Sequence, residues 1–136
     1  MTDCIFCKII KGEIPCDKIF EDKNTIAFLD INPVNKGHTL VVPKKHFETI
    51  FDTPDDVLSN LMKAVKKVSN EVLDGVEADG INLGVNNLRA AGQLVPHVHF
   101  HVIPRFNGDG LRHWPGKKLS DSEMKDISKK IKRTMR

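Results

Sequence analysis

Residues 97–103 read HVHFHVI, so that three histidines alternate with apolar residues. Alternation with a period of two is typical of a β-strand with one buried face, because successive side chains point to opposite sides of the sheet. We therefore predict a strand over residues 95–103 that ends at Pro104. Three imidazoles on one face indicate a functional site, since plain structure seldom needs them. The apolar residues face the core, and the other face carries His97, His99 and His101.

Clustered imidazoles support two kinds of chemistry. They can ligate a metal ion, or one of them can act as a nucleophile while its neighbours orient it and move protons. The loop before the strand, residues 86–94, favours phosphate chemistry, because Gly92 and its small neighbours let backbone N–H groups approach an anion. This loop lacks the G-x-x-x-x-G-K-S/T pattern of a P-loop. The residues alone leave both interpretations open.

Four further strands are expected, over residues 18–21, 24–30, 38–43 and 81–85. Their boundaries coincide with prolines, glycines and polar turns. Short connections between strands favour an antiparallel sheet. The helices are expected on one side of the sheet, which gives an α+β architecture. A single domain is expected, because the length of the chain is that of a typical domain.

A long helix is expected over residues 53–74. Thr53 can cap its N-terminus, Pro54 suits the first helical position, and Gly75 suits the stop. A shorter helix is expected at residues 5–10. The buried stripe of the long helix is predicted to be Leu58, Leu61, Met62, Val65, Val68 and Val72.

The end of the chain is basic and helical. Residues 117–136 hold eight Lys/Arg and three Asp/Glu, whereas the formal net charge of the whole chain is +3. Ser120 and Glu123 form a capping box, and the helix that follows carries Met124, Ile127 and Ile131 on one face. Lysine-rich faces of terminal helices are usually solvated, so a nucleic-acid partner is disfavoured.

Composition places the chain among ordinary globular proteins. Apolar residues make up 40% and charged residues 29%, which excludes a disordered chain. No apolar run approaches the ~18 residues that span a bilayer, and the N-terminus lacks the features of a secretory signal. The odd number of cysteines, three, favours thiols or metal ligands over a disulfide framework. We therefore expect a cytoplasmic protein that has no membrane partner.

Residues 92–103, GQLVPHVHFHVI, resemble the signature of the histidine triad (HIT) family, H-φ-H-φ-H-φ-φ with φ apolar. The resemblance extends over most of residues 4–104, and the tail resembles the Hint branch of the family. It therefore implies a single HIT domain over residues 1–136, with residues 105–136 as a tail and helix. The other matching blocks are CIFCKII at 4–10, FLDINP at 28–33, KGHTLVVPKKH at 36–46 and RHWPG at 112–116.

The resemblance implies a HIT-like fold, with a five-stranded antiparallel sheet and two main helices. Family members are homodimers, so two copies are expected to join their sheets into one continuous sheet of ten strands. Trp114 in the tail has two interpretations. It either packs locally or reaches toward the active site of the partner subunit.

The resemblance also implies an activity. Such proteins bind a purine nucleotide, such as AMP or GMP, and cleave at the α-phosphate of nucleoside phosphoramidates or dinucleoside polyphosphates. His99 would be the nucleophile that forms a covalent nucleotidyl-histidine intermediate. His101 and His38 would contact the phosphate and hold the proton network, with His97 completing the catalytic set. No cofactor is required for this chemistry.

The family's nucleotide-binding residues carry over to named positions. Asp30 would bind the ribose hydroxyls, and Asn86 would touch the phosphate or the leaving group. Backbone N–H groups around Gly92, Gln93 and Leu94 would stabilise charge on the phosphate oxygens. The apolar slot for the base would comprise Ile5, Phe6, Ile9, Phe28, Ile31 and Leu40, each of which could also belong to the core.

Leu94 departs from the family pattern, because many members carry Ser or Thr at this position. Leu94 offers a backbone N–H but no hydroxyl for the leaving-group atom. We therefore expect slow phosphoramidase activity. The alternative is a nucleotide-binding regulatory or interaction protein in which hydrolysis is weak or vestigial.

Cys4 and Cys7 form a C-x-x-C pair, which alone is a weak signal. A redox pair is an alternative, but the βαβ context of a thioredoxin-like site is missing. The resemblance supplies two further ligands, His46 and His97, which match a zinc site in a cysteine-containing subset of the family. A closed Cys2His2 site is structural, so Zn²⁺ is expected to hold the N-terminal segment rather than to act in catalysis. Cys16 is interpreted as an ordinary thiol.

Overall fold

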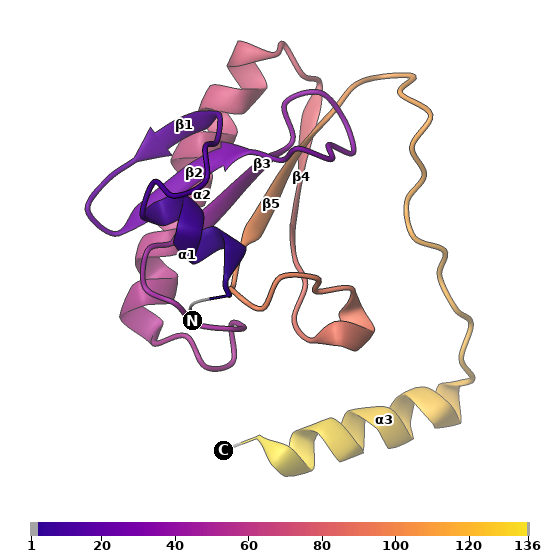
Figure 1. Cartoon of the computed structure of the whole chain (residues 1–136). Coiled ribbons are helices and arrows are strands. Elements are labelled where there is room, and N and C mark those ends of the chain that lie inside the picture. The colour runs from indigo at the N-terminus through magenta and orange to yellow at the C-terminus, as the bar shows by residue number, and fades with distance from the viewer. Residues whose placement is uncertain (1–2, 136) are drawn as a thin grey trace.

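A five-stranded antiparallel sheet forms the body of the molecule (Figure 1). The computed structural model describes residues 3–135, and its strands lie in the order β1-β2-β3-β5-β4. This confirms the predicted α+β fold. The strands are β1 (Lys18–Glu21), β2 (Thr25–Leu29), β3 (Thr39–Pro43), β4 (Gly80–Val85) and β5 (Phe100–Arg105). The helices are α1 (Ile5–Ile10), α2 (Asp55–Gly75), the 3-10 turn η1 (Arg89–Ala91) and α3 (Asp121–Thr134).

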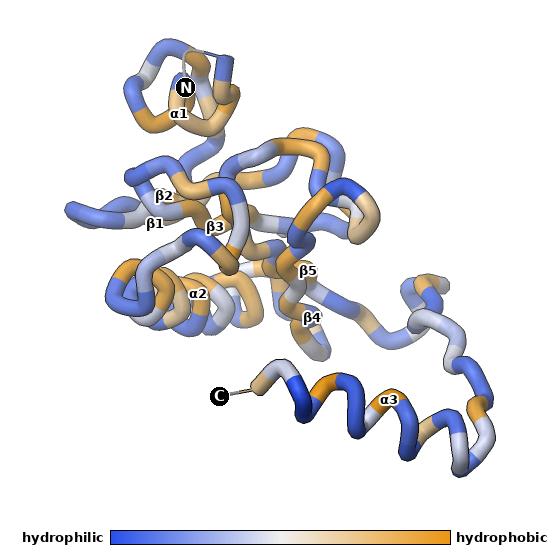
Figure 2. Tube along the Cα trace, turned by 90° about the horizontal axis from the view of Figure 1, so that it is seen from below, coloured by the Kyte–Doolittle hydropathy of each residue, from blue (hydrophilic) through white to orange (hydrophobic). Residues whose placement is uncertain are grey.

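Different helices cover the two faces of the sheet. Ala27 of β2 packs in a buried cluster with α2, whereas its neighbours Ile26 and Phe28 pack in a second cluster with Phe6 of α1. Figure 2 shows α1 and α2 on opposite sides of these strands. The prediction that the helices lie on one side is therefore wrong. Both faces of β2 are apolar, so each face needs its own cover.

β5 begins later and ends later than predicted. Residues 95–99 precede it without regular structure, and the strand continues through Pro104, which pairs with Ile81 of β4. The N–H and C=O of one strand residue point to the same side. Pro104 directs its carbonyl to Asn35, beyond the start of β3. Its missing N–H therefore costs no ladder hydrogen bond, and the strand can pass through it.

The ends of α2 also differ from the prediction. Pro54 is the N-cap residue, and the Thr53 hydroxyl donates to the Thr49 carbonyl at 2.6 Å instead of capping the helix. Gly75 is the last helical residue, and the left-handed conformation falls on Glu77, at φ 54°. Both termini were thus predicted within about two residues, the ordinary uncertainty of helix ends.

The buried stripe of α2 is close to the predicted one. Leu61, Val65, Val68 and Val72 are buried, and Leu58 packs partly against the same cluster. The prediction that Met62 is buried is wrong, since its side chain is 43% exposed. Ala64, which was not predicted, is buried instead. Met62 lies ~100° around the helix from Leu61, which turns it away from the sheet.

α3 forms where predicted and lies apart from the sheet, at the end of an extended segment (Figures 1 and 2). The Ser120 hydroxyl accepts from the Glu123 N–H at 3.2 Å, and the Glu123 carboxylate accepts from the Ser120 N–H at 3.0 Å. The capping box is therefore confirmed, but the apolar face of the helix is exposed. Within residues 3–135, no helix is long and apolar enough to cross a membrane. The exposed apolar side chains of α3 are Met124, Ile127 and Ile131.

Candidate functional site

Five of the six histidines form a row on the α1 side of the sheet. The ring centroids of His46 and His97 lie 4.8 Å apart, those of His99 and His101 4.9 Å, and those of His101 and His38 5.1 Å. Phe6 of α1 packs edge-on against both His97 and His99. The short N-terminal helix therefore covers the middle of the row.

His97 faces the two cysteines. Its Nε2 lies 2.9 Å from the Pro43 carbonyl, which fixes the ring proton on that nitrogen. The lone pair of Nδ1 then points at the Sγ atoms of Cys4 and Cys7, at 3.3 and 3.6 Å. Nδ1 of His46 lies 3.4 Å from Cys7 Sγ. The four predicted metal ligands thus come together from three separate segments, and we call them the Cys/His cluster.

The Cys/His cluster fits a tetrahedral metal ion. Its four ligand atoms lie within 4.8 Å of one another. Metal–sulfur and metal–nitrogen bonds of ~2.3 and ~2.0 Å require S···N separations of ~3.5 Å in a tetrahedral site. The separations of 3.3 to 3.6 Å match this value. Burial lowers the pKa of His97 to about 4, which keeps it neutral, and the Cys7 N–H donates to Cys4 Sγ. These are the support and protonation state that zinc ligands need.

No disulfide competes with metal binding among the described residues, since Cys4, Cys7 and Cys16 are all free thiols. Burial and the neighbouring Cys4 raise the pKa of the Cys7 thiol, so an uncompensated thiolate is disfavoured there. A bound cation would reverse that preference. Cys16 lies outside the Cys/His cluster and packs beside the α1-side core.

His99 is held in one tautomer. Its Nδ1 donates to the His97 carbonyl at 2.7 Å, so its Nε2 carries a free lone pair. Burial lowers the pKa of His99, which keeps the imidazole neutral. A neutral ring with one N–H anchored and the other nitrogen free is the state in which histidine acts as a nucleophile.

His38 and His101 form a hydrogen-bonded pair, which we call the His pair. The Val34 N–H donates to His38 Nδ1 at 3.0 Å, so the proton of His38 resides on Nε2. This Nε2–H donates to His101 Nδ1 at 2.9 Å, which leaves the His101 proton on its own Nε2. Burial lowers the pKa of both rings. The pair therefore leaves an N–H on His101, whose ring lies beside that of His99, with the centroids 4.9 Å apart.

Asp30 lies at the end of β2, beside this pair. Its Oδ1 accepts from the Asn32 N–H at 2.8 Å, and its Oδ2 lies 3.6 Å from His38 Nε2. Oδ2 is therefore free to accept from a ligand. Asn86 follows β4, and its Nδ2 faces Gly92, where it lies 3.8 Å from the position of a Cβ.

Four backbone N–H groups of the loop at residues 86–94 donate within the loop itself, those of Leu88, Ala91, Gly92 and Gln93. Gly92 donates to the Arg89 carbonyl at 2.9 Å and Gln93 to the Leu88 carbonyl at 3.2 Å. The Gln93 side chain accepts from the Leu88 N–H and donates to Val95. In the described part of the chain, the Leu94 N–H has no acceptor, and its side chain is 92% exposed. Of the three predicted amides, Leu94 alone is therefore free to meet an anion.

The structure separates the predicted base slot into two groups. Phe6, Phe28 and Leu40 are buried in the α1-side core, and Ile9 packs partly against it. Ile5 and Ile31 are 42% and 87% exposed, and both are available to a ligand. The first group packs α1 against β2 and β3, and only the second presents open apolar surface.

Sequence reasoning missed the backbone groups that fix each ring. The Pro43 carbonyl, the His97 carbonyl and the Val34 N–H decide which nitrogen of His97, His99 and His38 is protonated. Every residue type offers such groups, so no residue pattern reveals them.

Comparison with known proteins gives one consistent result. The profile of the HIT domain family matches residues 11–108. A HIT-like protein of Methanocaldococcus jannaschii is 62% identical over 79% of this chain and 82% of its own length. An adenosine 5'-monophosphoramidase of Schizosaccharomyces pombe is 44% identical over 95% and 98%. An adenylylsulfatase of Arabidopsis thaliana is 42% identical over 91% of this chain and 62% of its own length.

Solved structures agree with the fold over nearly the whole chain. A HIT-family crystal structure from Bacillus subtilis superposes with a TM-score of 0.89 at 39% identity, covering 98% of both chains. A zinc-bound histidine triad protein from Mycobacterium smegmatis superposes with a TM-score of 0.78 at 34% identity, covering 98% of this chain and 99% of its own.

Proposed function

The chain belongs to the HIT domain family, and on this basis we propose that it cleaves purine nucleotides at the α-phosphate through a covalent nucleotidyl-histidine. Relatives named as a monophosphoramidase and an adenylylsulfatase support nucleotide hydrolysis in general. The observation that carries the finer proposal is the fixed tautomer of His99, whose Nδ1 is anchored at 2.7 Å on the His97 carbonyl.

In the first step, His99 Nε2 attacks the α-phosphorus, a P–Nε2 bond forms, and the bond to the leaving group breaks. A leaving amine takes the proton from His101 Nε2. The His pair then lacks one proton, and the imidazolium that has formed on His99 offsets this charge, since the two rings lie 4.9 Å apart. Splitting the reaction into two displacements lowers the barrier of each.

In the second step, water attacks the same phosphorus atom, and the P–Nε2 bond breaks. The proton of the water returns to His101, so the His pair and His99 regain their starting states. Asp30 Oδ2 would accept from the ribose hydroxyls and the Leu94 N–H would stabilise a phosphate oxygen. Asn86 would contact the phosphate, and Ile5 with Ile31 would flank the base.

Zinc is proposed for the Cys/His cluster, where Cys4, Cys7, His46 and His97 would hold it. A four-ligand site leaves no open coordination position, so the ion would anchor α1 to the strands rather than take part in catalysis. Because Phe6 of α1 packs on His99, this anchor would also set the wall of the nucleotide site. The zinc-bound relative supports this proposal.

A homodimer is proposed from the surfaces that this chain leaves open. β4 is an edge strand, and Leu83 on it is 50% exposed. Trp114 is 87% exposed, so it does not pack locally, and α3 presents an apolar face. Pairing of β4 edges between two copies would form the ten-stranded sheet. The free thiols suit a reducing compartment, so the cytoplasm remains the proposed location.

A second candidate is a nucleotide-binding regulator with vestigial hydrolysis. The observation that favours it is Leu94, whose exposed side chain places no hydroxyl at the leaving group.

Mass spectrometry of the intact protein after a brief acid quench tests the two candidates. Wild type and His99→Ala are mixed with adenosine phosphoramidate and, separately, with diadenosine tetraphosphate. A nucleotidyl adduct in wild type alone supports the covalent mechanism and identifies the substrate that loads His99. No adduct, together with no product over hours, contradicts it and favours the regulator.

A further inference from the structure

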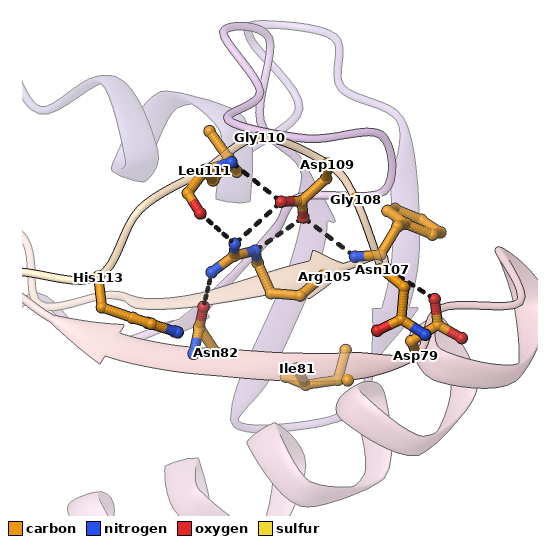
Figure 3. Close-up of a pocket in the computed structure, with 12 residues that line it drawn as sticks. Asp79, Ile81, Asn82, Arg105, Asn107, Gly108, Asp109, Gly110, Leu111 and His113 are labelled. Carbon is orange, nitrogen blue, oxygen red and sulfur yellow. Dashed lines mark hydrogen bonds and ion pairs between the residues drawn. The ribbon is translucent and has the colours of Figure 1, made fainter.

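The loop after β5 is closed by a clamp between Arg105 and Asp109 (Figure 3). Arg105 Nε donates to Asp109 Oδ2 at 2.8 Å, and its Nη2 donates to Oδ1 at 3.0 Å. The N–H groups of Phe106 and Leu111 donate to the same carboxylate. These hydrogen bonds hold the pKa of Asp109 well below its usual range. Asp109 is therefore a charged and fixed acceptor.

A hollow of about 510 Å³ lies beside this clamp, lined by β4, β5 and the following loop. Its main polar groups already bond to one another. Arg105 also donates to Asn82 Oδ1 and the Leu111 carbonyl, and the Asn107 N–H donates to Asp79 (Figure 3). The hollow therefore offers a ligand few unpaired groups, and the role of the clamp lies elsewhere.

One contact leads from the clamp toward the histidines. Asn35 Nδ2 donates to Asp109 Oδ2 and to the Pro104 carbonyl, each at 3.1 Å. Asn35 lies in the loop between β2 and β3, which has Asp30 at its start and His38 at its end. This side chain thus ties the loop of the nucleotide site to a segment about 70 residues further along the chain.

The backbone of Asn35 is also hydrogen-bonded to His38. The His38 N–H donates to the Asn35 carbonyl at 3.1 Å, and the preceding residue, Val34, donates its N–H to His38 Nδ1. Gly37 closes the turn at φ +91°, where a Cβ would meet Val76 at 3.0 Å and Pro104 at 3.1 Å. The turn is therefore closely packed at Gly37. At Asn35 it is held by the two side-chain hydrogen bonds to Asp109 and Pro104.

We propose that Asn35 is a positioning residue: its hydrogen bonds to Asp109 and Pro104 hold the turn in which Val34 fixes His38, so that His38 Nε2–H points at His101. Arg105 and Asp109 act through Asn35 and touch no substrate. The inference rests on the proposed function, because the His pair matters only if His101 exchanges a proton with the reacting groups.

Asn35→Ala is the test variant, and Lys36→Ala is its matched control. Lys36 lies in the same loop and also contacts the segment after β5, with its Nζ 5.1 Å from the centre of the Phe106 ring, but it makes no bond to Asp109. Two readouts are compared. One is the scalar coupling between His38 Nε2–H and His101 Nδ1 across their hydrogen bond, measured by ¹⁵N NMR well below the melting temperature. The other is kcat and KM for adenosine phosphoramidate.

We expect the coupling in wild type and Lys36→Ala, and its weakening in Asn35→Ala. The kcat of Asn35→Ala should fall about tenfold with KM nearly unchanged, since substrate contacts remain. A merely structural role would lower the melting temperature and leave the coupling of the folded molecules intact. That result, or a lower kcat with an unchanged coupling, overturns the proposal.

Two safeguards keep the test decisive. If Asn35→Ala does not fold, Asp109→Ala removes the side-chain acceptor of the same hydrogen bond and is judged by the same readouts. If wild type turns over no substrate, the proposed function fails, but the coupling still reports whether Asn35 positions His38. Active wild type with unaltered coupling and kcat in the variant means that the positioning inference alone fails.

Discussion

The Cys/His cluster and the His pair lie on the same side of the sheet and use imidazole in opposite ways. In the Cys/His cluster, nitrogen atoms of His46 and His97 converge with two sulfur atoms within 4.8 Å. In the His pair, two hydrogen bonds follow one another: the Val34 N–H meets the lone pair of His38 Nδ1, and the His38 Nε2–H meets the lone pair of His101 Nδ1. Convergent lone pairs suit a cation, whereas alternating donors and acceptors store and move protons.

The difference teaches that residue type does not set the role of a histidine here. His97 and His99 are two residues apart, and burial keeps both neutral. His97 gives its Nε2–H to a carbonyl of β3, so its Nδ1 meets the sulfurs. His99 gives its Nδ1–H to the His97 carbonyl, so its Nε2 stays free. The backbone partner of one nitrogen decides what the other nitrogen does.

The largest expected effect separates the two groups by chemistry. His99→Ala should lower the kcat for adenosine phosphoramidate by at least about 10³-fold, because it removes the proposed nucleophile. Its zinc content should stay at the wild-type value. Turnover assays together with metal analysis of the purified variant measure both. His113→Ala, at an exposed position of the tail, is the control. Zinc loss in His99→Ala would show that the groups do not act separately.

Cys4→Ala removes one ligand of the Cys/His cluster. It should abolish stoichiometric zinc binding and lower the melting temperature by about 10 °C or more, because the ion no longer joins α1 to the strands. Metal analysis and calorimetry are the measurements. Cys16→Ala removes a thiol outside the cluster and should keep its zinc. Wild type that holds no zinc at a one-to-one ratio would contradict the metal site altogether.

In metal-free protein, the buried neutral histidines should make the free energy of unfolding decrease at acid pH. The unfolded chain protonates His97 near its usual pKa of about 6.5, whereas the folded chain does so at about 4. Between these values the unfolded state binds more protons. Stability should therefore be level above pH 6.5 and fall as the pH drops toward 4, by on the order of 3 kcal/mol for this ring.

The lowered pKa values of His38, His99 and His101 act in the same direction and steepen the fall. Urea titrations in the presence of a chelator, at several pH values from 4 to 8, measure the slope. His113→Gln, at an exposed position of the tail, is the control variant. A stability that stays constant from pH 6.5 to 4 would mean that these rings titrate normally in the folded state.

The smallest effect concerns the edge of the proposed nucleotide site. Leu94→Ser should raise kcat for the phosphoramidate by about three- to tenfold, because the new hydroxyl can pass a proton to the leaving amine. Leu94→Ala removes the same bulk without a hydroxyl and should give no such gain. Equal rates for the two variants would show that a hydroxyl at this position does not assist departure of the amine.

The sequence carried enough local information for most of the elements. Apolar segments bounded by prolines, glycines and polar turns located β2, β3 and β4, and the capping box of Ser120 and Glu123 located α3. Such signals depend on neighbours within about four residues, so a single sequence contains them whole. The resemblance to the HIT family then brought Cys4 and Cys7 together with His46 and His97, a ligand set that C-x-x-C spacing could not supply.

Other features lay outside the reach of local signals. The apolar alternation of β2 does not say which helix covers which face, so the placement of α1 opposite α2 was missed. Residues 95–99 alternate like a strand, but the pairing partners of β5 begin at Phe100. The apolar stripe of α3 was predicted on one face of the helix, but the pattern alone does not place that face, which is exposed in the described chain.

By itself, the sequence determined the α+β elements, the capping box of α3 and the presence of a histidine-rich strand, because short-range propensity and periodicity encode them. Tertiary structure alone decided which nitrogen of each histidine holds a proton. His97 depends on a carbonyl 54 positions away in the chain, and His38 depends on a turn that Asn35 ties to Asp109. A hydrogen bond needs two atoms within about 3 Å, and only the folded chain brings such distant atoms together.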